Sequence, residues 1–223
     1  MSAVRKAGKH WSVKPNDALA GSWPEVLQPR ARYFVRPSLI HGTGHVARVT
    51  IHAWIIGHRY RPDILPELMA AAFIHDLSRR HDDTCEEHGI LAVREQLPKW
   101  RAALQSMGAE DFALVSEMVG RHCLPQAKND SLEVRLFRNA DGLDRVHLGD
   151  LNPAMLFDGS QELLQLAWKL YEARTDKLSK LLELVPPQLL VPPPNKTSNK
   201  SQVIRQQGST YCEDSTRIYW YIQ

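Results

Sequence analysis

An adjacent histidine and aspartate stand at the end of an apolar run in this sequence. Residues 70–74 read Ala-Ala-Ala-Phe-Ile and lead, without a charge, into His75 and Asp76. A charged pair at the end of a buried helix is costly unless another group compensates it, and a metal ion is the usual compensation. A hydrogen-bonded His–Asp contact in a core fits the pair equally well. The other histidines and carboxylates of the chain therefore decide between the two interpretations.

Further imidazoles and carboxylates fall near the ends or on the inward sides of separate predicted helices. With the adjacent pair they make six candidate metal ligands: His45, His75, Asp76, His88, His122 and Asp141. Inward His and carboxylate side chains in a helical bundle are a known way to bind one or two metal ions. Because neighbouring residues on a helix point about 100° apart, His75 and Asp76 can share an ion only if it lies between their directions. Asp76, with two oxygens, could also bridge two ions.

Hydrophobic periodicity predicts the helices that would position these groups. We expect helices over residues 43–57, 63–77, 84–97, 111–121, 130–147 and 160–184. Thr84 and Glu87 have the spacing of a capping box at the start of the third helix, and Pro98 should end it. No segment shows sustained alternation of apolar and polar residues, so the predicted fold class is an all-α helical bundle.

The 223 residues suit one domain with extensions, and a hydrophobic content of 43% is enough for a core. We expect a basic N-terminal arm at 1–22, an all-α domain at 23–185 and a Pro-rich linker with an irregular tail at 186–223. A net charge of +3 is too mild to favour nucleic acid as a partner. No apolar run is long enough for a membrane helix, and no apolar signal core opens the chain. Three cysteines without paired spacing add to the expectation of a cytoplasmic protein with reduced thiols.

The order of His45, the His75-Asp76 pair and Asp141 resembles the HD-domain superfamily of metal-dependent phosphohydrolases. Residues 41–49 look like the family's first histidine segment, residues 70–79 like its Ala-Ala-x-x-His-Asp-x-x-Arg motif, and residues 139–145 like its final aspartate helix. A His-Asp dipeptide alone is a weak signal, whereas four ligands in this order are a specific one. The resemblance covers about residues 38–150 and says nothing about either terminus.

The resemblance implies one divalent ion held by this ordered set of four. His88 and His122 stand in contexts similar to the two extra ligands of the family's two-metal subgroup, so Asp76 would bridge to a second ion. Sites of His and Asp accept Fe, Mn, Mg, Co or Ni, and the sequence does not choose among them.

The activity implied by the resemblance is hydrolysis of a phosphate ester or anhydride on a small molecule, with a nucleotide as the favoured substrate. The metal would lower the pKa of a bound water toward ~7. Asp76, Asp141 and Asp144 are then the candidate catalytic carboxylates, and Asp144 or the free oxygen of Asp141 would take the proton of the water.

Three arginines are candidates for binding a substrate phosphate, because a guanidinium matches phosphate oxygens bidentately. They are Arg79, Arg48 and Arg145. Structural roles are the alternative: a helix C-cap for Arg79, and an Asp141–Arg145 or Asp144–Arg48 ion pair. The remaining histidines in these segments are interpreted as helix-face, helix-end or solvated residues and not as ligands: His52, His58, His81 and His147.

Other functions on the same scaffold stay open at this point. A di-iron oxygenase would use a similar six-ligand set, and a non-catalytic nucleotide-sensing module would keep the fold, although a full ligand set argues against it. A nuclease has only the basic arm in its support. The sequence leaves the oligomeric state open, including a homo-oligomer, and indicates no membrane partner.

Overall fold

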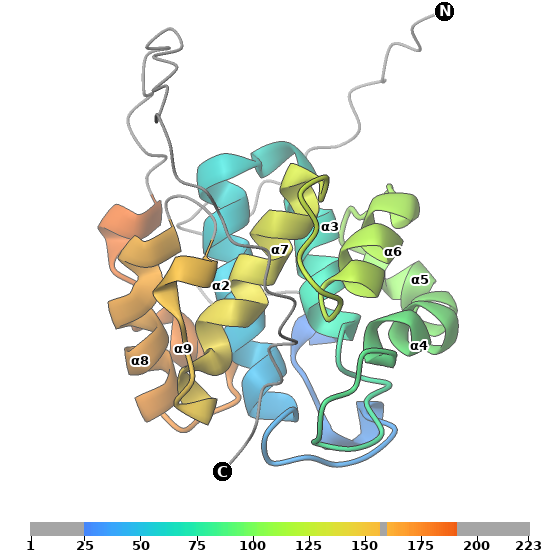
Figure 1. Ribbon diagram of the computed structural model, residues 1–223, viewed down its shortest axis with the longest axis horizontal. Helices are drawn as coiled ribbons and strands as arrows, with labels where there is room; N and C mark the ends of the chain where they lie inside the picture. Colours follow the sequence, from blue (N-terminus) through green and yellow to red (C-terminus); the bar gives the residue numbers. More distant parts are fainter. Residues whose placement is uncertain (1–24, 157–159, 191–223) are drawn as a thin grey trace, which may run out of the picture. The chain divides into compact units, whose positions relative to one another are not determined.

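A computed structural model describes residues 25–156 and 160–190, which belong to one compact unit. The predicted basic arm and the tail beyond residue 190 lie outside the described residues. The described chain is helical and contains no strand, so the predicted all-α fold class is confirmed (Figure 1). Its α-helices are α2 (Thr43–Tyr60), α3 (Leu65–Ile74), α4 (His88–Glu95), α5 (Leu97–Ser106), α6 (Phe112–Arg121), α7 (Leu132–Leu143), α8 (Leu164–Glu172) and α9 (Leu178–Leu182).

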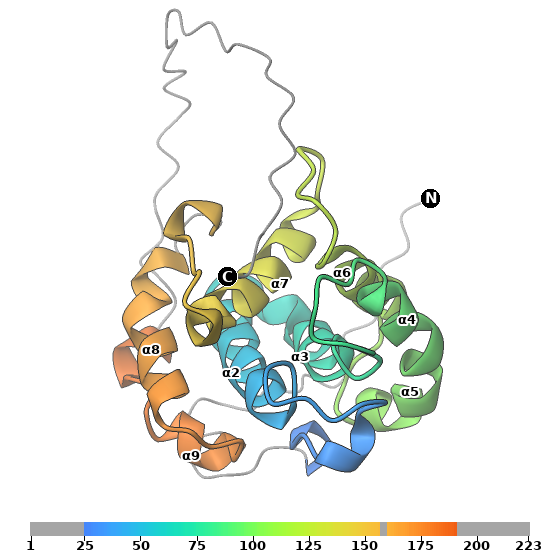
Figure 2. The ribbon, with the colours of Figure 1, turned by 60° about the horizontal axis from the view of Figure 1, so that its bottom comes forward.

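Helices α2 and α3 occupy the middle of the described fold. Residues 45–57 of α2 are buried without interruption, and nearly all of α3 is buried. A helix that is apolar on every side belongs in a core, and these two lie antiparallel with α7 beside them. Helices α4, α5 and α6 cover one flank, and α8 and α9 cover the other (Figures 1 and 2). Because α2, α3 and α7 are covered on both flanks, functional groups at their ends are held by a rigid core.

Gly57 does not end the first helix, contrary to the sequence prediction. Helix α2 continues to Tyr60, and the glycine lies where α3 packs closely against it. A Cβ at Gly57 would lie 2.6 Å from Leu65 Cδ1, which is closer than real Cβ contacts. The glycine therefore permits close helix packing and does not act as a stop signal.

The third predicted helix begins too early, and a further helix that was not predicted follows it. Helix α4 begins at His88, its N-cap residue Glu87 makes no side-chain capping bond, and so the predicted capping box at Thr84 does not form. Pro98 does not simply end a helix, since it stands in the first turn of α5, a helix that the periodicity did not predict. Proline is tolerated in a first turn because the amide hydrogen it lacks would have no partner there.

The last two predicted helices are shorter than expected. Helix α7 ends at Leu143 and the chain continues as a 3₁₀ helix, η4 (Asp144–Leu148). The predicted helix over 160–184 is divided into α8 and α9, with Arg174 between them at a φ of 46°. A positive φ is unfavourable for a residue with a Cβ and cannot continue a right-handed helix, so α8 ends before Arg174. None of the described helices combines the length and apolarity needed to cross a membrane.

Candidate metal centre

Four of the predicted ligands meet where α2 begins and α3 and α7 end. His45 lies in the first turn of α2, His75 and Asp76 follow α3, and Asp141 lies near the end of α7. Figure 2 brings this end of the three helices forward. The convergence follows from helix direction, because α2 runs opposite to α3 and its start must lie beside the end of α3.

The ligand atoms of these four residues have the spacing of a coordination shell. His45 Nε2 lies 3.0 Å from His75 Nε2 and 3.3 Å from one carboxylate oxygen of each aspartate. His75 Nε2 lies 3.7 Å from the same two oxygens, Asp76 Oδ2 and Asp141 Oδ1. With metal–ligand bonds of about 2.0–2.2 Å, neighbouring ligands lie about 3.0–3.5 Å apart. We call this group the first ion position.

His88 and His122 form a second group on the other side of Asp76. Their Nε2 atoms lie 2.8 Å apart, and His88 Nε2 lies 3.2 Å from Asp76 Oδ1. Asp76 therefore presents Oδ2 to the first ion position and Oδ1 to this second ion position. The contact needs Gly89, because a Cβ there would lie 2.2 Å from the carbonyl oxygen of Val119. Glycine thus lets α4 approach α6 closely enough for the two imidazoles to meet.

Three of the histidines are oriented by the same backbone contact. Each directs Nδ1 at the carbonyl oxygen of the residue three positions earlier: His75 at Ala72 (2.9 Å), His122 at Val119 (2.6 Å) and His88 at Cys85. A carbonyl oxygen only accepts hydrogen bonds, so Nδ1 carries the proton in His75 and His122. His88 Nδ1 also lies 3.2 Å from the donor Arg79 Nη1, but its contact with the carbonyl oxygen of Cys85 is shorter and favours the same tautomer. In the neutral ring, Nε2 is then left as a bare lone pair directed at the centre of the site.

His45 is oriented instead by a buried carboxylate. Its Nδ1 lies 2.7 Å from Asp144 Oδ2, and Asp144 is fully buried. Arg48 holds Asp144 from the other side, with Nε 2.5 Å from Oδ1 and Nη2 2.9 Å from Oδ2. The Asp144–Arg48 ion pair considered from the sequence is therefore present. Asp144 lies behind His45 and fixes the ring, as outer partners of metal-binding histidines do.

The donor atoms fit a bound cation and are badly matched to one another. The Nε2 atoms of His88 and His122 face each other at 2.8 Å, where two lone pairs repel unless a cation or proton lies between them. The 3.0 Å contact between His45 and His75 has the same geometry, and without an ion a proton on His45 bridges it. Asp76 Oδ1 is buried and makes no hydrogen bond. Buried polar atoms normally have partners, and a missing partner points to an ion or water. The residues present therefore fit one divalent ion in each position.

The protonation states of the site residues also suit the binding of divalent ions. Burial lowers the pKa of His122 to about 3 and also lowers the pKa of His88. Burial opposes ionisation of Asp76 and Asp141, yet nearby histidines hold the pKa of each carboxyl below its usual range. Neutral imidazoles and ionised carboxylates are the forms that bind metal.

His45 is the exception among the histidines. Burial lowers its pKa, but hydrogen bonds to three aspartates outweigh burial and raise the pKa well above 6.5. Without an ion, a proton on His45 therefore offsets part of the negative charge of the site. A metal ion that enters the first ion position has to displace this proton.

The three candidate phosphate-binding arginines are placed differently. Arg79 donates to the carbonyl oxygens of His81 and Asp83 and lies 3.8 Å from Asp76 Oδ1, so it supports a loop beside the site. Arg48 is committed to Asp144, and Arg145 pairs with Asp150. Arg79 is thus the candidate nearest to a predicted ligand.

Two histidines that the sequence prediction did not include also reach this site. His41 Nδ1 lies 3.2 Å from Asp76 Oδ2, and His147 Nδ1 lies 3.2 Å from Asp144 Oδ2. His41 begins the segment 41–49 and precedes His45 by four residues, and this placement was the available signal for it. His147 was interpreted as a residue that is not a ligand, and it lies in η4, directly after α7.

The chain has no match among protein-family models, curated proteins or solved structures. The site is therefore interpreted from its own chemistry. A helical fold with buried His/Asp groups that could bind metal is compatible with an HD-like domain.

Proposed function

We propose that the chain is an HD-type metal-dependent phosphohydrolase with two divalent ions bridged by Asp76. The observation that carries the proposal is the placement of Asp76, whose two oxygens face separate groups of inward Nε2 atoms. His45, His75 and Asp141 would complete the first ion position, and His88 and His122 the second. Paired ions of this kind lower the pKa of a water and neutralise charge on phosphoryl oxygens.

Asp141 is the residue best placed to handle the proton of the attacking water. Its side chain is 29% exposed, whereas the side chains of His45, His75 and Asp76 are at most 3% exposed. Substrate and water would therefore reach the ligands from the side of Asp141. One Asp141 oxygen faces the first ion position, and the other would accept the proton as general base.

Asp144, the other candidate base, serves better as a positioning residue. Both of its oxygens contact Arg48, and one also contacts His45. Asp144 is also fully buried, so it has no oxygen free to contact a water at the site. Its contribution would be to hold His45 in the tautomer that presents Nε2 to the ion.

The substrate would be a small anionic phosphate compound. The described ligand set supplies three carboxylate oxygens and four imidazole nitrogens, so two divalent ions leave the site net positive. Arg79, beside Asp76, adds a further positive charge at the edge of the second ion position. A phosphate group matches this charge, and a nucleotide or sugar phosphate is the class to screen first.

The test combines metal analysis with a substrate screen. The purified protein is stripped, reloaded with Mn²⁺, Fe²⁺, Co²⁺, Ni²⁺ or Mg²⁺, and assayed for phosphate release from nucleotides, sugar phosphates and synthetic phosphate esters. We expect activity that requires metal and is lost in Asp76→Ala, with Asp63→Asn as a matched carboxylate control far from the site. Phosphate release by the stripped protein at the rate of the loaded protein would contradict the proposal. Oxygen consumption by the iron form, without phosphate release, would favour the oxygenase alternative.

A further inference from the structure

A second pair of histidines lies beside the first ion position without belonging to it. His41 comes from the loop before α2, and His147 comes from η4. Their side chains are 14% and 7% exposed. The two ring centroids are 6.0 Å apart, and each is 5.4 Å from the ring of His45. Three imidazoles from separate segments thus surround one small volume.

His147 is held in the same way as the histidines of the two ion positions. Its Nδ1 contacts the backbone carbonyl of Asp144, three residues earlier, as His75, His88 and His122 contact theirs. Nδ1 therefore carries the proton and Nε2 is a bare lone pair. His147 Nε2 is buried and makes no hydrogen bond.

His41 offers a second nitrogen without a hydrogen bond. Its Nδ1 is buried and lies 3.2 Å from Asp76 Oδ2 at an angle that makes no hydrogen bond. One ligand atom from each of His41, His45 and His147 lies within 4.8 Å of the others. Two buried nitrogens without a hydrogen bond, one of them 3.2 Å from a carboxylate oxygen, form a group of the kind that holds a cation.

This group cannot simply be an extension of the first ion position. His45 Nε2 is already directed at His75 and the two aspartates, and His45 Nδ1 is bonded to Asp144. A cation between His41 and His147 would therefore be separate and would share only the Asp76 edge. Imidazoles alone supply no negative charge. The remaining ligands of a cation between His41 and His147 would therefore be water or an anionic oxygen of the substrate.

We propose that His41 and His147 form a third, weaker divalent-cation position, completed by a phosphate oxygen. The proposal rests on the proposed function, because the phosphate that completes the third position is the one held at the first two. It predicts that the chain takes up an additional ion when phosphate is present. It also assigns His41 and His147 to substrate binding through that ion.

The test is a count of Mn²⁺ bound to the full chain by equilibrium dialysis, with and without inorganic phosphate. We compare the wild type with His41→Gln, His147→Gln and the control His58→Gln, which removes a histidine at the far end of α2. The expected result for the wild type and the control is two tightly bound ions and a third that binds more tightly with phosphate. Each of the other two variants should lose the third ion and keep the first two.

Three outcomes would overturn the third position. They are a wild type that saturates at two ions in both conditions, variants that keep the third ion, and variants that lose one of the first two ions. The first of these leaves the two-ion proposal intact, whereas a wild type that binds no ion contradicts both proposals. Circular dichroism of each variant confirms folding, and the two variants lie in different segments, so misfolding of one leaves the other informative.

Discussion

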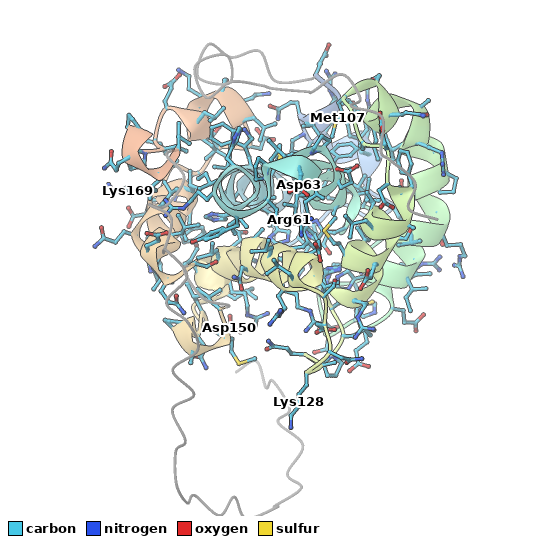
Figure 3. The ribbon with its side chains drawn as sticks, turned by 90° about the horizontal axis from the view of Figure 1, so that it is seen from above. Arg61, Asp63, Met107, Lys128, Asp150 and Lys169 are labelled. Carbon is cyan, nitrogen blue, oxygen red and sulfur yellow. The ribbon has the colours of Figure 1, made fainter. Side chains whose placement is uncertain are left out.

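The two ends of the helices α2, α3 and α7 differ in how their carboxylates are buried and paired. At one end Arg61 contacts Asp63 and Glu133, which join the end of α2 to the starts of α3 and α7. Figure 3 labels Arg61 and Asp63 beside each other at this end. At the other end, buried imidazoles and carboxylates converge, with Arg48 beside Asp144 and Arg79 beside Asp76.

The carboxylates at the two ends differ in their exposure to water and in the positive charges that pair with them. Arg61 supplies a positive charge to two carboxylates that are 57% and 18% exposed, so that end is balanced by its own residues and by water. At the opposite end Asp76 is 2% exposed and Asp144 is fully buried, with Arg48 bound to Asp144 and Arg79 Nη1 3.8 Å from Asp76 Oδ1. Charges buried this deeply are costly without close partners, and the buried His/Asp groups at this end could hold a metal ion. Substitutions at the two ends should therefore affect metal binding and stability differently.

The largest effect is expected for Asp76→Asn. The substitution removes the negative charge between the two ion positions while it keeps the shape of the side chain. Metal affinity should fall by more than about 100-fold, which is the upper end of the loss expected when a residue that only orients a metal ligand is replaced. Isothermal titration with Mn²⁺ measures the loss, and Asp63→Asn at the other end should bind metal as the wild type does. Equal affinity in Asp76→Asn and the wild type would break the comparison.

Removal of one imidazole from the second ion position should halve the metal content. In His88→Ala or His122→Ala only the first ion position keeps its full ligand set, so elemental analysis should fall from two ions per chain toward one. Two ions in either variant would show that these histidines are not ligands.

A smaller loss is expected for Asp144→Asn. The amide cannot hold His45 in one tautomer as the carboxylate does, so Mn²⁺ affinity at the first ion position should fall by about 10–100-fold. Mn²⁺ titration of this variant and of Asp150→Asn, a carboxylate on the same segment, gives the comparison. An unchanged affinity would assign Asp144 to folding alone.

Metal affinity should also fall as the pH falls. A proton on His45, whose pKa is raised well above 6.5 without metal, competes with the first ion already near neutral pH. His122, with a pKa of about 3, stays neutral and does not compete in this range. Mn²⁺ dissociation constants measured from pH 8 to pH 5.5 should therefore rise first for the first ion position. A dissociation constant independent of pH would contradict the assignment of His45 as a ligand.

The smallest effect is expected at the balanced end. Arg61 is 27% exposed, so Arg61→Gln should lower the free energy of unfolding by about 1 kcal/mol or less. Urea denaturation with a chelator present measures this change, and metal content should stay that of the wild type. A loss of bound ions in Arg61→Gln would show that the two ends are coupled.

Helix periodicity and the order of the ligands in the sequence predicted the helical fold and the four residues of the first ion position. His45, His75, Asp76 and Asp141 could be grouped because each lies near an end or on the inward side of a predicted helix, and the structure brings their ligand atoms together. The start of α4 and the existence of α5 were missed because Thr84 and Pro98 have local preferences that tertiary packing overrides.

The supporting residues could not be ranked from the sequence. The sequence suggested an Asp144–Arg48 ion pair, but only the structure shows that Asp144 also holds His45 Nδ1. His147 reaches the site through the same turn, and His41 through the loop before α2. Irregular segments carry no periodic signal, so their side-chain directions follow from the folded chain alone.

The most direct measurement is an anomalous difference map from a crystal grown with Mn²⁺. The account predicts two peaks about 3.5–4 Å apart, with one oxygen of Asp76 on each. His45, His75 and Asp141 should surround the first peak, and His88 and His122 the second. A map without a peak at Asp76, or with both ions held by other residues, would contradict the central claim.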